Sequence, residues 1–117
     1  MPAPRGGRGE PLLALVGPTA VGKTEAGVIL AEALRAEIVS VDSTTIYRGM
    51  DVGTAKPSPE LRARVPHHLV DVAEPEELFT VARYQELARE AIRGIRERGR
   101  RVLLVGGSGL YFRAVVD

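Results

Sequence analysis

A glycine-rich segment near the N-terminus constrains this chain more than any other feature of its sequence. It matches the pattern G-x-x-x-x-G-K-[ST] in full, through Gly17, Pro18, Thr19, Ala20, Val21, Gly22, Lys23 and Thr24. The glycines allow consecutive backbone N–H groups to face phosphate oxygens, and a following helix adds the positive potential of its N-terminus. Lys23 is expected to contact the terminal phosphate, and the Thr24 hydroxyl to bind Mg²⁺. The segment therefore predicts a bound diphosphate or triphosphate.

The residues on both sides predict the strand and the helix that such a loop requires. The apolar run 12–16 is typical of a buried parallel strand, and 37–41 predicts a second one. Between them, helical spacing predicts one apolar stripe that faces the core, made of Ala26, Ile29, Leu30, Ala33 and Leu34. This order of strand, loop, helix and strand is a βαβ unit, for which we expect a right-handed crossover.

The rest of the chain continues the alternation of helices and strands. Residues 42–66 predict a long loop with one helical turn near 60–64, and 68–72 a short strand. Thr80 is expected to cap a helix that ends at Gly99. Helical spacing predicts an apolar stripe along it, made of Val81, Tyr84, Leu87, Ala88, Ala91, Ile92 and Ile95. A third buried strand is predicted at 102–105, and a further helix begins at 110–116. The fold class is therefore α/β, with a P-loop NTPase-like parallel sheet flanked by helices. Because a three-stranded parallel sheet would keep bare edges, we expect it to be incomplete on its C-terminal side.

Length and composition limit the remaining possibilities. The chain has 117 residues and no cysteine, which fits one small domain without disulfides or thiolate metal sites. A net charge of +1 neither requires nor excludes nucleic acid, and no apolar run is long enough to cross a membrane. Residues 1–11 are rich in Arg, Gly and Pro and predict a disordered lead-in, or alternatively a short basic arm on RNA. Residues 12–117 then form the domain, and a cytoplasmic location is expected.

The position of the acidic residues separates this chain from ordinary nucleotide hydrolases. Those enzymes carry an acid at the end of a second strand, where it holds Mg²⁺. Here the strand 102–105 is followed by Gly106, Gly107 and Ser108, while an acid, Asp42, follows the strand 37–41 instead. Ligands of open α/β sheets bind at the carboxyl ends of strands, so this arrangement favours group transfer with an acceptor near Asp42. A simple turn or helix cap is the alternative role for Asp42.

Several blocks together resemble bacterial tRNA dimethylallyltransferases. After the glycine-rich segment come Asp42-Ser43, then Tyr-Arg-Gly-Met-Asp-Val-Gly-Thr-Ala-Lys-Pro at 47–57, Pro-His-His-Leu at 66–69 and Val-Gly-Gly-Ser-Gly-Leu-Tyr at 105–111. The resemblance runs from Leu12 almost to the end, and the block 47–57 is its most specific part. It implies the N-terminal part of a P-loop prenyltransferase, because members of the family are more than twice as long.

The resemblance implies the transfer of a dimethylallyl group from dimethylallyl diphosphate to N6 of the adenosine beside the tRNA anticodon. The glycine-rich segment would hold the donor's diphosphate with Mg²⁺, bound through Thr24, although it is often described as an ATP site. Asp42 would be the general base, and Thr19 would lie near the bridging oxygen of the leaving group. Contacts to tRNA would come from Asp42, Ser43, Thr44, Thr45 and Ser108. A cytoplasmic enzyme that is a monomer at full length, and inactive as this piece alone, is expected.

The chain departs from the family at a few positions, and some features keep two interpretations. Thr44 and Thr45 replace more apolar or amide-bearing residues, and Ser108 stands where Thr is common. Tyr47 and Tyr111 fit base or prenyl stacking as well as core packing. His67 and His68 favour structural hydrogen bonds over metal binding, and the seven arginines of 83–101 favour a solvated helix face over a tRNA backbone contact. A P-loop small-molecule kinase and a nucleotide-binding piece without turnover are the alternative functions.

Overall fold

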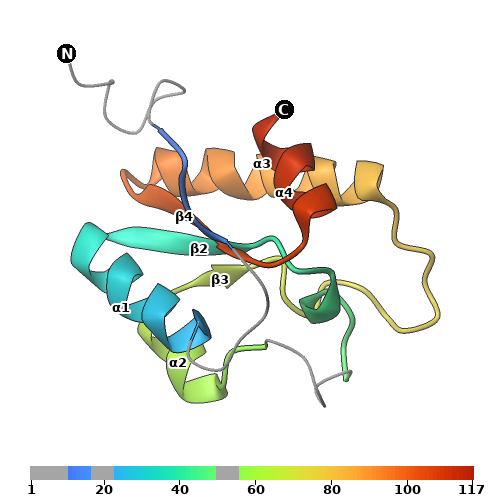
Figure 1. The fold of residues 1–117 in the computed structure, drawn as a ribbon, viewed down its shortest axis with the longest axis horizontal. Helices are drawn as coiled ribbons and strands as arrows, with labels where there is room; N and C mark the ends of the chain where they lie inside the picture. Colours follow the sequence, from blue (N-terminus) through green and yellow to red (C-terminus); the bar gives the residue numbers. More distant parts are fainter. Residues whose placement is uncertain (1–10, 17–22, 50–55) are drawn as a thin grey trace.

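The computed structural model describes residues 11–16, 23–49 and 56–117, which form a parallel sheet between two layers of helices (Figure 1). The strands lie in the order β1-β4-β2-β3, all parallel. Their bounds are Leu13–Val16 for β1, Ala36–Ser40 for β2, His67–His68 for β3 and Arg101–Gly106 for β4. The helices are α1 (Lys23–Leu34), α2 (Pro59–Arg64), α3 (Val81–Glu97) and α4 (Gly109–Val116), with a 3₁₀ turn, η1, at Ser43–Thr45. The predicted α/β class is confirmed.

Alternate residues of the central strands enter two separate cores. Val39, Val102 and Leu104 face α3 and α4, where they join the larger cluster around Tyr84 and Ile95. Ile38 and Leu103 point the other way and pack against α1 and α2, with Val28, Ala31 and Val65. Because successive side chains of a strand point to opposite faces, the near-continuous apolar runs of the sequence are those of strands covered on both sides.

The edge strand is shorter than the sequence predicts and begins one residue earlier. The expected strand at 68–72 exists only at His67–His68, where β3 pairs with β2. Leu69 and Asp71 then adopt left-handed backbone conformations, with φ of 68° and 58°, and these end the strand. Two residues are too few for a period-two pattern, so the sequence offered little signal for this edge.

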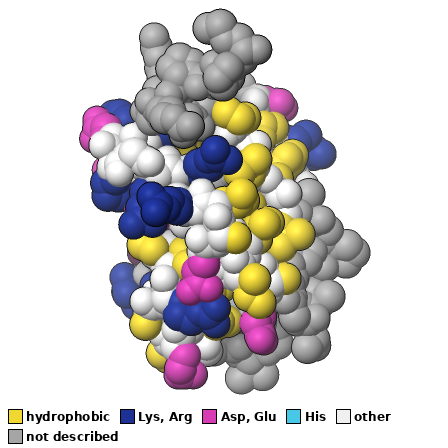
Figure 2. Space-filling view, turned by 90° about the vertical axis from the view of Figure 1, so that its left-hand side faces the viewer, with side chains coloured by type: hydrophobic (Ala, Val, Ile, Leu, Met, Phe, Trp, Pro, Cys, Tyr) yellow, Lys and Arg dark blue, Asp and Glu magenta, His cyan; other side chains and the backbone are white. Residues whose placement is uncertain are grey.

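The predicted inward face of α1 is wrong except at Leu34, which is partly buried and packs against the core. Ile29 is 56% exposed and Leu30 38% exposed, and Ala26 and Ala33 also face solvent, whereas Val28 and Ala31 are fully buried. Gly27 explains the choice of face, because a Cβ added there would lie 3.2 Å from the Val105 side chain. Small residues thus let the helix approach the sheet closely. Figure 2 shows hydrophobic side chains gathered in a band on the face that lies at the left of Figure 1.

The predictions for α3 are confirmed. The Thr80 hydroxyl accepts a hydrogen bond from the Arg83 amide at 3.1 Å, which caps the helix, and Gly99 follows its end with a φ of 76°. The expected apolar stripe is buried at Tyr84, Ala88, Ile92 and Ile95. Most of the arginines of 83–101 are exposed, as a solvated face requires. No helix within the described residues has the length and apolar character needed to cross a membrane.

The two histidines have structural roles. His68 Nε2 lies 2.7 Å from Glu37 Oε1, and Arg98 binds the same carboxylate through two nitrogens, at 2.9 and 2.6 Å. The hydrogen bonds from Arg98, with that from His68, hold the pKa of Glu37 below its usual value despite burial. The His67 ring contacts the Val65 carbonyl at 2.8 Å, and burial lowers its pKa. Among the described residues, no group of three His, Cys, Asp or Glu side chains is arranged to hold a metal ion.

Candidate active site

Three neighbouring strands end at the same edge of the sheet, and each leads into a segment that the sequence predicts to be functional. Val16 of β1 is level with Gly106 of β4, and Ser40 of β2 is level with Val105. The chain continues from these ends into residues 17–22, into Ser108 and into Asp42. The predicted site residues Gly17, Pro18, Thr19, Ala20, Val21 and Gly22 lie outside the described residues. Helix α1 starts with Lys23 and Thr24, directly after them.

Strand order fixes the separation between the two halves of the site. Because β4 lies between β1 and β2, Asp42 is two strand spacings, about 10 Å, from the line of β1. The carboxyl ends of β1 and β2 are therefore separated by the width of β4.

Gly106 allows the ends of β4 and β2 to approach each other. A Cβ on this residue would lie 2.7 Å from the Val41 carbonyl carbon and 2.9 Å from the Asp42 amide nitrogen, both backbone atoms. The close approach is bridged by backbone hydrogen bonds from Val41 N to Val105 O at 2.9 Å and from Ser108 N to Val41 O at 3.0 Å. The glycine thus brings Asp42 and Ser108 together across the sheet edge.

Asp42 is buried, with 4% of its surface exposed, and its carboxylate is held in one orientation. Oδ1 accepts hydrogen bonds from the Thr44 amide at 3.0 Å and from the Thr44 hydroxyl at 2.7 Å. Asp42 is thereby the N-cap of η1. The capping role that the sequence left open is present, and it fixes the carboxylate at the sheet edge.

The hydroxyl groups after Asp42 divide into exposed and buried ones. Ser43 and Thr44 are exposed, and Ser108 is partly exposed at the N-cap of α4. Thr45 is only 2% exposed, and its hydroxyl bonds Ser40 Oγ at 2.7 Å and the Asp42 carbonyl at 2.9 Å. We therefore assign Thr45 a structural role beneath the segment and do not retain it among the proposed tRNA contacts.

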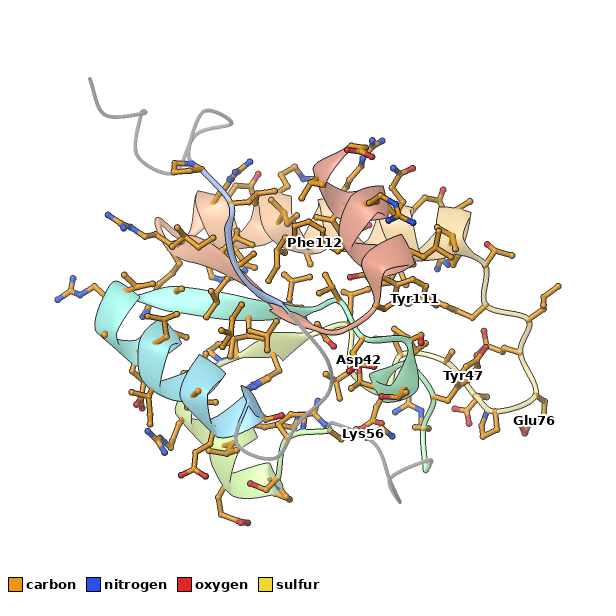
Figure 3. All side chains as sticks on the ribbon, in the orientation of Figure 1. Asp42, Tyr47, Lys56, Glu76, Tyr111 and Phe112 are labelled. Carbon is orange, nitrogen blue, oxygen red and sulfur yellow. The ribbon has the colours of Figure 1, made fainter. Side chains whose placement is uncertain are left out.

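The aromatic residues near the site are mainly structural. Tyr84 of α3 is fully buried and donates a hydrogen bond to the Ser40 carbonyl at 2.5 Å. Tyr111 stacks on it, with ring centroids 4.1 Å apart and an interplanar angle of 24°, and is 7% exposed. Burial raises the pKa of both phenols, so both stay protonated. Tyr111 thus packs in the core, whereas Tyr47 is half-buried and lies at the same end of the molecule as Asp42 and Lys56 (Figure 3).

Sequence reasoning missed two residues that shape this site. Tyr84 was recognised only as part of an apolar stripe, although a tyrosine within such a stripe needs a partner for its hydroxyl. Lys56 lies in the block 47–57, where it received no role, and its side chain is only 8% exposed. A lysine directly before a proline in an otherwise specific block was the available signal.

The fold and the site together define a class, that of parallel α/β proteins with a phosphate-binding sequence after the first strand and an acid after a neighbouring one. Comparison with known families then names the family. The model described as "IPP transferase" matches residues 45–117, which is more than half of the chain. The chain belongs to the IPP transferase family.

Curated relatives and solved structures agree with this assignment. A tRNA dimethylallyltransferase from Roseiflexus sp. (strain RS-1) is 58% identical over 92% of this chain, and one from Desulforudis audaxviator (strain MP104C) is 61% identical over 92%. The full-length tRNA isopentenylpyrophosphate transferase of Bacillus halodurans superposes with a TM-score of 0.84 at 55% identity, over 90% of this chain. A eukaryotic dimethylallyltransferase acting on tRNA gives a TM-score of 0.82 at 27% identity, over 88% of this chain and 26% of its own. The chain spans about 35% of the Roseiflexus and Bacillus proteins.

Proposed function

We propose that this chain forms the donor site and the general base of a tRNA dimethylallyltransferase. The donor is dimethylallyl diphosphate, and the acceptor is N6 of the adenosine adjacent to the anticodon in tRNA. The observation that carries the proposal is the oriented, buried carboxylate of Asp42, two strands from the phosphate-binding sequence. The names of the relatives supply the substrate class.

The proposed reaction is a displacement at the allylic carbon of the donor. The adenine N6 forms a bond to that carbon while the bond to the bridging oxygen of the diphosphate breaks, and Asp42 accepts the proton that N6 loses. Lys23, the backbone N–H groups of the loop and the start of α1 stabilise the charge that gathers on the departing diphosphate. Thr19 contacts the bridging oxygen. Thr24 would supply a hydroxyl ligand to Mg²⁺, which when bound neutralises diphosphate charge.

The acceptor contacts are proposed for the polar groups that remain accessible. Ser43 and Thr44 are exposed beside Asp42, and partly exposed Ser108 is joined to the same sheet edge by its amide, which donates to the Val41 carbonyl. The adenosine would have to leave its stack to reach this edge of the sheet. We further propose a cytoplasmic enzyme that acts as a monomer at the length of its relatives. A small-molecule kinase that binds ATP is the competing function, favoured by the glycine-rich sequence alone.

Replacing Lys23 with alanine tests the donor half of the proposal. We expect the affinity for dimethylallyl diphosphate with Mg²⁺ to fall by roughly tenfold or more, because a hydrogen bond to a charged group contributes about 1.5–3 kcal/mol. Isothermal titration calorimetry on the 117-residue chain measures this. Equal affinity of the two proteins would contradict the assignment of the loop, and ATP turnover that depends on Lys23 would favour the kinase.

The chain alone is expected to transfer no dimethylallyl group above background. Positioning of two reactants contributes about 7–11 kcal/mol to such reactions. Most residues that hold the tRNA are proposed to lie in the part of the relatives that residues 1–117 do not cover. The assay combines the purified chain, Mg²⁺, labelled dimethylallyl diphosphate and unmodified tRNA. The matched positive control joins residues 1–117 to the remaining part of the Bacillus halodurans relative. Transfer by the chain alone at the rate of that chimera would contradict the expectation.

A further inference from the structure

Lys56 carries an ammonium group that is almost fully removed from solvent, with 8% of its side chain exposed. Its Nζ lies 2.6 Å from Asp71 Oδ1 and donates a hydrogen bond to the Tyr47 carbonyl at 2.5 Å. A buried charge is costly unless it is paired and hydrogen-bonded, so such contacts indicate a specific role. Lys56 thereby joins three segments of the chain, at positions 47, 56 and 71.

Asp71 occupies an unusual backbone conformation that needs support from its neighbours. Its φ is 58° and that of Leu69 is 68°, in the left-handed region that side-chain-bearing residues seldom adopt. Arg62 of α2 contacts the other carboxylate oxygen, with Nη1 and Oδ2 3.1 Å apart. Burial works to raise the pKa of Asp71, but the hydrogen bonds and charges of Lys56 and Arg62 lower it overall. The carboxylate is therefore ionised at neutral pH and held from two sides.

The turn at Asp71 is joined directly to the segment that follows Asp42. The Asp71 amide donates to the Thr45 carbonyl at 2.9 Å, and the Val72 amide donates to the Ile46 carbonyl at 2.8 Å. Thr45 in turn bonds the Asp42 carbonyl, through its amide at 3.1 Å and its hydroxyl at 2.9 Å. A continuous series of hydrogen bonds thus runs from the Lys56–Asp71 ion pair to Asp42. Figure 3 labels both ends of it, Lys56 and Asp42.

We infer that Lys56 is a positioning residue for the acceptor side of the site, acting through Asp71 and η1 on the Asp42 carboxylate. The inference rests on the proposed function, because it assigns Asp42 to the acceptor. The inference gives a role to one residue of the block 47–57, and it assigns different roles to the two lysines of this chain. Lys23 serves the diphosphate, whereas Lys56 holds the carboxylate segment in place.

The test is amide hydrogen exchange, measured by NMR on the 117-residue chain with Lys56→Met. The Asp71 and Val72 amides are expected to exchange about tenfold faster or more, because local opening of this turn becomes easier. Amides between β2 and β4 should keep their rates. The Thr44 amide, which donates to Asp42 Oδ1, should change its chemical shift. Arg62→Met is the matched control and should have a smaller effect, since the Arg62 side chain is 39% exposed.

Asp71→Asn provides a second test if Lys56→Met fails to fold, since Asn tolerates the left-handed conformation. It should reproduce the faster exchange and the Thr44 shift. Unchanged exchange at Asp71 and Val72, or an unchanged Thr44 signal, in a folded variant would overturn the inference. So would faster exchange of equal size throughout the sheet, which indicates general destabilisation. Binding of inorganic pyrophosphate with Mg²⁺ should be equal in all variants, and its absence in the unmodified chain would count against the proposed function alone.

Discussion

Asp42→Asn is expected to lower the rate of dimethylallyl transfer by about 10²–10⁴-fold, the usual contribution of a positioned general base. The experiment uses the chimera of residues 1–117 with the remaining part of the Bacillus halodurans relative, with labelled donor and saturating tRNA. Asn is isosteric with Asp and ranks with it as an N-cap residue, so η1 should keep its hydrogen bond from the Thr44 amide. Calorimetric affinity for dimethylallyl diphosphate should stay the same, because the proposed donor site follows β1, two strands from β2.

Asp42→Ala is the companion variant that separates the two roles of this carboxylate. It removes the base and the cap together, and should therefore lose about 1 kcal/mol of unfolding free energy in addition to the loss of rate. If Asp42 were only a cap, Asn would transfer at a nearly normal rate and Ala alone would be impaired. That pattern would remove Asp42 from the mechanism.

Tyr84→Ala should cost about 3–5 kcal/mol of unfolding free energy, the range for truncating a large buried aromatic residue. Tyr84 is fully buried, and it supports the site from behind through its ring stacked on Tyr111 and its hydroxyl bonded to the Ser40 carbonyl. The total free energy of unfolding of a small domain is only about 5–15 kcal/mol, so this loss should lower the urea midpoint strongly. Urea unfolding followed by circular dichroism measures it.

Tyr84→Phe is the control, because it keeps the ring and removes only the hydroxyl. It should cost about 1 kcal/mol, the typical net contribution of one hydrogen bond. A Phe variant as unstable as the Ala variant would show that the bond to Ser40, rather than the stacked ring, carries the stability. A loss below about 1 kcal/mol for Ala would contradict the assignment of Tyr84 to the core.

The sequence predicted those parts of the fold that depend on local patterns. Strands β1, β2 and β4 were recognised from apolar runs, and α3 from its period and its Thr80 cap, because both signals lie within a few residues of one another. The inward face of α1 was not predicted correctly, because Val28 and Ala31 on one face are apolar, and so are Ile29 and Leu30 on the other. Only the close approach of Gly27 to Val105 on β4 decides between the two faces.

The site was predictable to the extent that position along a strand determines it. Asp42 was recognised because an acid that directly follows a buried strand lies at the ligand edge of a parallel sheet. The burial of Thr45 could not be predicted, because a Ser-Thr-Thr sequence is polar. Only the η1 turn directs the Thr45 hydroxyl toward Ser40. The role of Lys56 was missed for a related reason, since its partner Asp71 lies beyond α2 in the chain.

The pairing of β1 also has a consequence for how the chain folds as it is synthesised. Leu13 pairs with Leu103, so β1 is synthesised long before its partner β4. Synthesis proceeds at about 5–20 residues per second, which leaves β1 and the adjoining phosphate-binding sequence without that partner for several seconds. Sequence-distant pairings of this kind also slow folding, because a long loop must close before the contacts form. Strand β1 is therefore synthesised well before β4, and its edge stays without that partner during the interval.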